Sequence, residues 1–236
     1  MINICGTEFD LAHPTSIYVN CDCMIGMKQF PDKYFDLAVV DVPYGIGESG
    51  DKNHTRGKLA TSKDYKAFSG NDLKPPDDTY FKELFRVSKN QIIWGANHFI
   101  SKIPYDSHCW IVWDKDNGET DFADCELAWT SFDTAVRKFK YRWQGMLQEN
   151  MKNKETRIHP TQKPVALYEW ILTKYAKEGD IILDTHVGSA SSLIACHNTN
   201  HKFIGFELDE HYYKLSKERL DRELAQMNLF DFIGGQ

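Results

Sequence analysis

Short apolar runs alternate with amphipathic stretches along most of this chain. The runs occupy residues 16–20, 35–41, 91–94, 109–113, 181–184 and 203–206, with a further one at 126–132. Each has the length and apolar content of a buried β-strand. The amphipathic stretches repeat apolar residues at helical spacing and lie at 77–88, 161–176, 189–198 and 209–225. Strands that alternate with helices of this length predict an α/β fold, in which helices cover both faces of a mainly parallel sheet.

Two long polar segments interrupt this alternation. The first, residues 45–76, is rich in Gly, Lys, Asp and Ser, and the second, residues 137–157, carries seven basic residues against two glutamates. Loops of this length are uncommon in a compact domain unless they serve a function. Although the chain has a formal net charge of −6, a local basic stripe is enough to hold a phosphate backbone. Both segments are therefore candidate nucleic-acid-binding loops, and solvated surface loops are the alternative.

The overall composition narrows the class of protein. The chain has 236 residues, of which 42% are hydrophobic, and this suits a single globular domain over residues 1–236. No apolar run approaches the ~18 residues of a membrane span, and the N-terminus lacks the basic start and apolar stretch of a signal peptide. The six cysteines form no C-x-x-C pairs, so we expect reduced thiols and no metal site. These features predict a cytoplasmic protein without a membrane partner.

The first unusual strand end is Asp41-Val42-Pro43-Tyr44. In open α/β sheets, ligands bind beyond the carboxyl ends of the strands. An amino group on a flat ring would find two acceptors here, the Asp41 carboxylate and the Val42 carbonyl. Two such hydrogen bonds would aim the nitrogen lone pair at an incoming methyl group and stabilise the charge that develops. Pro43 fixes the direction of the carbonyl, and Tyr44 offers a stacking face. A structural turn with a buried tyrosine is the alternative.

Two further strand ends carry residues that suit a nucleotide-like ligand. Asp184 ends one run, and a small-residue turn then leads through Gly188 into a helix, whose first N–H groups favour a polar or anionic ligand. Glu207 ends the next run about twenty residues later, at the place where nucleotide-binding sheets hold ribose hydroxyls. The turn lacks the G-x-G-x-x-G pattern, which disfavours a nicotinamide oxidoreductase. An ordinary strand-to-helix turn is the alternative.

Taken together, these motifs resemble those of the DNA amino-methyltransferases, in the subgroup whose catalytic motif precedes the cofactor motif. Residues 41–44 correspond to the D-P-P-Y motif of that family, residues 184–192 to its cofactor loop, and Glu207 to its ribose-binding acid. The run His159-Pro160-Thr161-Gln162-Lys163-Pro164 is close to the family's H-P-T-x-K-P, and Asn20-Cys21-Asp22 resembles its N-G-D.

The resemblance implies a Rossmann-like class I methyltransferase domain with a seven-stranded, mainly parallel sheet and a circularly permuted motif order. It also implies S-adenosylmethionine as the cofactor, with Lys163 paired to the cofactor carboxylate and Asp22 near the adenosine. The expected cofactor-binding residues are Asp22, Thr161, Lys163, Asp184, His186, Gly188, Ser189 and Glu207, and the expected catalytic residues are Asp41, Val42, Pro43 and Tyr44. Val42, His186 and Ala190 depart from the family's pattern, so a relative that binds the cofactor or DNA without turnover is an alternative.

The resemblance also implies the substrate. An aspartate at the first motif position favours adenine N6 as the target, with cytosine N4 as the alternative, and RNA and protein substrates stay open. A base inside a duplex must flip out to reach such a site. The expected DNA contacts are His54, Arg56 and Lys58 in the first loop and Arg137, Lys138, Lys140 and Arg142 in the second. A restriction-modification enzyme of a bacterium or phage would fit these features.

The end of the chain carries a second candidate partner site. Residues 226–232 resemble the Q-x-x-L-F peptides by which bacterial proteins dock on the replication sliding clamp, with Gln226, Leu229 and Phe230 as the anchors. An apolar patch that packs on this domain is the alternative.

Overall fold

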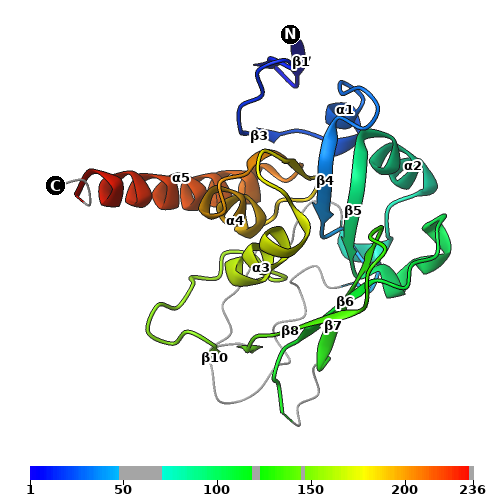
Figure 1. Cartoon of the computed structure of the whole chain (residues 1–236), viewed down its shortest axis with the longest axis vertical. Helices are drawn as coiled ribbons and strands as arrows, with labels where there is room; N and C mark the ends of the chain where they lie inside the picture. Colours follow the sequence, from blue (N-terminus) through cyan, green and yellow to red (C-terminus); the bar gives the residue numbers. More distant parts are fainter. Residues whose placement is uncertain (48–70, 119–122, 145–146, 234–236) are drawn as a thin grey trace.

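An eight-stranded sheet forms the centre of the part of the chain that the computed structural model describes (Figure 1). That part comprises residues 1–47, 71–118, 123–144 and 147–233, except for the side chains of residues 71 and 227–233. The strands lie in the order β3 (Ile17–Asn20), β12 (Lys202–Glu207), β11 (Ile181–Asp184), β4 (Phe35–Val40), β5 (Ser88–Trp94), β7 (Cys125–Thr130), β6 (Trp110–Asp114) and β8 (Arg137–Lys140). Neighbours from β3 to β5 are parallel, and β7 runs antiparallel to both β5 and β6.

Helices cover both faces of this sheet. One face packs against α1 (Cys23–Met27) and α2 (Asp78–Val87), and the other against α3 (Val165–Tyr175), α4 (Ser191–Asn198) and α5 (Glu210–Ile233). The alternation along β4 decides which residues face which layer: Ala38 and Val40 join the first core, whereas Leu37 and Val39 join the second. The remaining short elements are η2 (Asn71–Leu73), η3 (Ala96–His98), η4 (Ile100–Lys102) and two antiparallel strand pairs, β1 (Ile2–Ile4) with β2 (Thr7–Phe9), and β9 (Trp143–Gln144) with β10 (Leu147–Gln148).

The α/β class, the mainly parallel sheet and the helices on both faces are confirmed, but the expected strand count is wrong. The sheet has eight strands rather than seven, because β8 lies in the segment 137–157, for which the sequence predicts a loop. Among the described strands, this one pairs only with β6. Three of its four residues are exposed and only Phe139 is partly buried, so its sequence has no apolar alternation that would predict a strand.

Two element boundaries also differ from expectation. The helix predicted at 161–176 begins at Val165, because Pro164 has an extended backbone and forms the N-cap. The helix predicted at 209–225 continues to Ile233 and projects away from the sheet (Figure 1). It therefore includes most of the segment 226–232. None of the helices in the described ranges is both long and apolar enough to cross a membrane.

The expectation of reduced thiols is wrong for one pair of cysteines. Cys5 lies in the turn between β1 and β2 and forms a disulfide with Cys21, which follows β3. The two Cα atoms are 6.0 Å apart, within the usual range for a disulfide. The separation of 16 residues in the chain hides this proximity from a search for short cysteine spacings. The bridge attaches the N-terminal hairpin to the strand that leads into Asp22.

Candidate active site

The polar residues expected at the strand ends gather at one edge of the sheet. Asp41 follows β4, Asp184 ends β11 and Glu207 ends β12. These strands are parallel neighbours, so their carboxyl ends lie on the same edge. The chain continues from β4 to β5 on one side and from β11 to β12 on the other. The boundary between β4 and β11 is thus a topological switch point, where open α/β sheets bind their ligands.

Asp41 is held by two side chains, one of them from its own motif. The Tyr44 hydroxyl donates to Asp41 Oδ1 at 2.7 Å, and Lys163 Nζ donates to Asp41 Oδ2 at 2.6 Å. Lys163 Nζ also lies 3.0 Å from the Tyr44 hydroxyl oxygen. The structure thus joins two motifs that lie more than a hundred residues apart in the chain. Lys163 faces the expected catalytic carboxylate, so a contact between this lysine and a cofactor carboxylate would compete with the ion pair to Asp41.

Two charged residues that the sequence motifs do not include extend this cluster. Glu126 Oε2 lies 3.0 Å from Lys163 Nζ, and its Oε1 lies 2.5 Å from Lys115 Nζ. Glu126 belongs to β7, and Lys115 directly follows β6. The Lys163 side chain is only 3% exposed, so this ammonium group depends on its anionic partners. The sequence signal for Glu126 is that it is the one acid in the strand predicted at 126–132.

Burial and the neighbouring charges set the ionisation of this cluster. Burial raises the pKa of Asp41, Lys163 only partly offsets this effect, and the negative charge of Glu126 raises the pKa further. Burial would raise the pKa of Glu126 too, but Lys163 and Lys115 together hold it at about 2. Burial opposes the charged form of Lys163, but the two carboxylates outweigh it and raise its pKa. Burial also raises the pKa of Tyr44, so this phenol remains a neutral donor.

The Tyr44 ring is fixed from the neighbouring strand. Gly95 follows β5 with φ +68°, and a Cβ atom at this position would lie 2.1 Å from the ring. His98 in η3 stacks on Tyr44, with the ring centroids 5.3 Å apart and the planes at 15°. Val42 is 2% exposed and packs in the first core. Its side chain is therefore structural, and only its backbone is available for the expected role.

The expected cofactor turn begins at Asp184. Its Oδ1 accepts the backbone N–H of His186 at 2.9 Å, and its Oδ2 accepts the hydroxyl of Ser192. Burial raises the pKa of Asp184 to about 7 and lowers that of His186 to about 4. Ser189 is buried, and its hydroxyl pairs with that of Ser191 at 3.0 Å. The Ser189 hydroxyl thus faces the protein.

Ala190, which departs from the family's glycine, has φ +64° and forms the N-cap of α4. A left-handed conformation costs an ordinary residue about 1–2 kcal/mol relative to the right-handed one. The residue is fully buried, and its methyl group packs in the second core. This methyl group therefore fills space in the core and does not protrude over the strand ends.

Two acids flank the turn on the side of β12. Glu207 Oε2 accepts the backbone N–H of Gly188 at 2.8 Å, and Oε1 accepts that of Asp209 at 2.8 Å. Asp22 follows β3, the strand next to β12, and caps α1 by accepting the N–H of Met24 at 2.8 Å. Both carboxylates are thus held in place by backbone groups at the same edge as Asp184.

The segment 159–164 passes over this edge and connects its two halves. The His159 ring packs on Tyr212 with centroids 4.4 Å apart, and it lies 3.9 Å from the position of a Cβ atom on Gly188. Thr161 is exposed, and its hydroxyl lies 3.1 Å from His159 Nδ1. Lys163 then turns inward to Asp41. The segment therefore contacts both the expected cofactor turn and the expected catalytic carboxylate.

Four of the seven residues expected to bind DNA lie in the described part of the chain. Lys138 pairs with Asp114 at 3.2 Å, and Asp116 pairs with both Lys140 at 2.9 Å and Arg142 at 2.6 Å. These ion pairs are exposed to solvent, where such pairs are weak, so a phosphate could replace the aspartates. Arg137 is exposed at the start of β8. His54, Arg56 and Lys58 lie outside the described residues.

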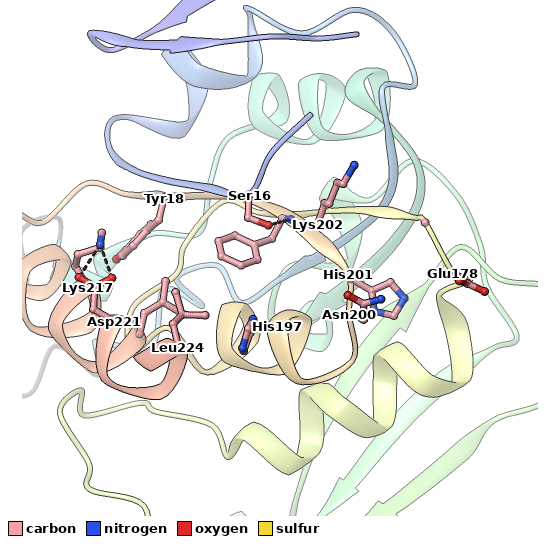
Figure 2. A pocket seen from close by; sticks show the side chains of 13 residues that line it. Ser16, Tyr18, Glu178, His197, Asn200, His201, Lys202, Lys217, Asp221 and Leu224 are labelled. Carbon is pink, nitrogen blue, oxygen red and sulfur yellow. Dashed lines mark hydrogen bonds and ion pairs between the residues drawn. The ribbon is translucent and has the colours of Figure 1, made fainter. Parts of the chain in front are cut away.

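A cavity of about 480 Å³ lies elsewhere, at the opposite edge of the sheet (Figure 2). Its lining includes Ser16 just before β3 and Lys202 at the start of β12, together with side chains of α4 and α5. These are the amino ends of the strands, so the cavity is separate from the cluster around Asp41. Among the described residues, no group of three or more His, Cys, Asp or Glu side chains is placed to hold a metal ion.

Comparison with known proteins identifies the family. A family model for N6/N4 methyltransferases, described as DNA methylase, matches residues 35–218. This match includes β4 with Asp41, the segment 159–164 and the strand ends at Asp184 and Glu207. The chain belongs to the DNA methylase family.

Individual relatives match shorter parts of the chain. It is 44% identical over 81 residues to the type II methyltransferase M.HpaI of Haemophilus parainfluenzae, a match that covers 34% of this chain and 25% of that protein. It is 37% identical over 87 residues to the type II methyltransferase M2.DpnII of Streptococcus pneumoniae, covering 37% and 32% respectively. The matches thus span a quarter to a third of the curated relatives.

The fold is similar to that of solved methyltransferases. The crystal structure of the M1.HpyAVI–SAM complex superposes with a TM-score of 0.54 at 21% identity, covering 86% of this chain and 98% of that one. At this identity the likeness supports the fold alone. The fold is therefore shared with a protein that has been solved with this cofactor.

Proposed function

We propose that this protein transfers a methyl group from S-adenosylmethionine to the exocyclic amino group of a flipped base in DNA, with adenine N6 as the target. The observation that supports this best is the placement of the Asp41 carboxylate and the Tyr44 ring at the switch point of the sheet, beside the turn after Asp184. Membership of the DNA methylase family supports the same reaction.

The residues at the strand ends fit this cofactor chemically. S-adenosylmethionine carries a sulfonium and an ammonium group, and the edge presents the carboxylates of Asp41, Asp184 and Glu207. Burial holds the pKa of Asp184 at about 7, and a cation nearby would favour its ionised form. We assign cofactor binding to Asp22, Thr161, Lys163, Asp184, His186, Gly188, Ser189 and Glu207, with Ser189 acting through its backbone because its hydroxyl faces inward.

The chain's own residues orient the target. Asp41 and the Val42 carbonyl each accept one N–H of the amino group, and Pro43 holds the direction of that carbonyl. Tyr44 supplies a face for the base, and stacking of this kind contributes about 1–3 kcal/mol. When bound, the cofactor would supply an electrophilic methyl carbon, and the electron pair of the broken C–S bond would stay on sulfur in the thioether product. The amino nitrogen forms the new C–N bond and loses one proton, which Asp41 accepts and returns to water.

Transfer of a labelled methyl group tests this function. Unmethylated genomic DNA and RNA are each incubated with the labelled cofactor, and the products are digested to nucleosides and measured by mass. We expect N6-methyladenine from DNA and none from the Asp41→Asn variant. N4-methylcytosine would move the assignment to cytosine. Cofactor binding without transfer to either nucleic acid would contradict the proposed activity and favour a binding module.

DNA contacts are proposed on two segments of the single methyltransferase domain, residues 45–76 and 137–157. In the second, Arg137, Lys138, Lys140 and Arg142 gather along and after β8. Strand β8 is parallel to β6, and Lys140 pairs with Asp116 beyond the end of β6. Lys115 follows β6 and contacts Glu126 in the candidate active site. The basic residues along and after β8 therefore extend outward from that site. In the first segment, His54, Arg56 and Lys58 are the proposed contacts.

A sliding clamp is a second proposed partner, through Gln226, Leu229 and Phe230. These residues belong to the last turns of α5, which projects away from the sheet (Figure 1). Binding as an extended peptide would require these turns to unwind. A pull-down with purified clamp tests this, with Leu229→Ala and Phe230→Ala as matched controls, and failure of the wild type to bind would end the proposal.

The cellular setting follows from the same proposal. Both curated relatives are type II methyltransferases of bacteria. We therefore propose that the protein acts in the cytoplasm of a bacterium, from a bacterial or phage gene, in restriction-modification.

A further inference from the structure

Lys115 and Glu126 form a second layer of charge behind the proposed catalytic motif. Together with Lys163 and Asp41 they make an alternating series, in which successive charged groups lie 2.5, 3.0 and 2.6 Å apart. The series begins after β6, crosses β7 and ends at the carboxyl end of β4. Its formal charges cancel, and only Asp41, the last member, belongs to the motif that meets the target amine.

Lys163 has three oxygen partners in this series. Its ammonium group has three N–H bonds, and three oxygen atoms lie within 3.0 Å, from Asp41, Glu126 and Tyr44. Tyr44 in turn donates to the other oxygen of Asp41. Both oxygens of the Asp41 carboxylate are thus anchored, and each still has a lone pair for a further donor.

We infer that Glu126, held by Lys115, is a positioning residue that shares Lys163 with Asp41 and so sets the orientation and ionisation of the carboxylate that receives the target amine. This inference rests on the proposed function for the identity of that amine, but the charge arrangement does not depend on it.

The sharing of Lys163 between two carboxylates adjusts how much negative charge Asp41 presents to the amine. A buried carboxylate without a cation would take up a proton and lose its value as an acceptor. A carboxylate with a cation of its own would be fully compensated and would attract the developing positive charge more weakly. Lys163 favours the ionised form of Asp41, and Glu126 draws part of that lysine away, so the ionised carboxylate keeps part of its charge for the amine. Lys163 and Tyr44 contact Asp41 directly, and Glu126, Tyr168 and Asp184 interact with it electrostatically.

The inference is tested on the full-length protein by following the titration of the Asp41 carboxyl with ¹³C NMR, assigned with Asp41→Asn. Glu126→Gln keeps the shape of the side chain but removes a negative charge, so the Asp41 titration should move to lower pH. Lys163→Met removes the cation, so it should move to higher pH, by about 1–3 units. Lys214→Met is the matched control, since its exposed lysine pairs with Glu210 on α5, and should leave the titration in place.

The acid limb of kcat/KM for methyl transfer should move in the same two directions. An Asp41 titration that does not move in Glu126→Gln, or that moves to higher pH, would overturn the inference. If Lys163→Met does not fold, Glu126→Gln decides the question alone. If the wild type transfers no methyl group, the proposed function fails while the NMR titration still decides the role of Glu126.

Discussion

Replacing Gly95 by alanine would test whether the Tyr44 ring must stand where the structure places it. The new Cβ atom would lie 2.1 Å from the ring, and the backbone at this position has φ +68°. The left-handed conformation costs alanine about 1–2 kcal/mol, and the steric overlap adds about 1–3 kcal/mol. We therefore expect the free energy of unfolding to fall by about 2–5 kcal/mol.

The effect on activity should be separate from the effect on stability. Movement of the ring would break its hydrogen bond to Asp41 and remove the stacking face, which contributes about 1–3 kcal/mol. This corresponds to a loss of about 5- to 150-fold in kcat/KM. Gly118→Ala is the matched control, because Gly118 has φ +65° and no atom within 4 Å of its Cβ position. It carries the same backbone strain without the overlap.

Urea unfolding and methyl-transfer kinetics on both variants measure these quantities at a temperature where each is folded. Gly118→Ala should lose only about 1–2 kcal/mol and keep its activity. Equal losses of stability in the two variants, with equal activity, would refute the placement of the Tyr44 ring against Gly95.

Two further predictions concern charge. Burial raises the pKa of Asp184 from 3.8 to about 7, so its contribution to stability is fully present below about pH 4 and is lost as the pH rises to about 7. Asp184→Asn should therefore gain stability relative to wild type as the pH rises from about 4 to about 7 in urea unfolding without cofactor, and a constant difference across this range would contradict the prediction. Neutralising Arg137, Lys138 and Lys140 together should flatten the dependence of log DNA affinity on log salt concentration by up to about 0.9 for each phosphate that the variant no longer neutralises, measured by fluorescence anisotropy, and an unchanged slope would exclude these residues from the DNA interface.

The strands that carry the candidate site could be predicted from the sequence because they are buried on both faces. Runs such as 35–41 and 181–184 are apolar almost throughout, and each ends at the acid that marks the sheet edge. The parallel pairing of β4 with β11 follows from the alternation of strands and helices. Strand β8 could not be predicted in this way, because it packs little apolar surface and depends on pairing with β6.

The motif residues of the candidate site could be found from the sequence, but their contacts could not. Lys163 stood out within the segment 159–164, yet its ion pairs with Asp41 and Glu126 depend on the tertiary structure. Glu126 and Lys115 lie in no motif, and only the antiparallel pairing of β6 with β7 brings them together. A charge network between strands distant in the sequence has no local pattern.

The most direct test of the proposed activity is the single-turnover rate of methyl transfer to DNA for wild type and Asp41→Asn, measured beside cofactor Kd. If Asp41 receives the target amine, the rate at saturating cofactor should fall by about 10²-fold or more. A variant that transfers the methyl group at the wild-type rate would contradict the assignment of Asp41 and the account built on it.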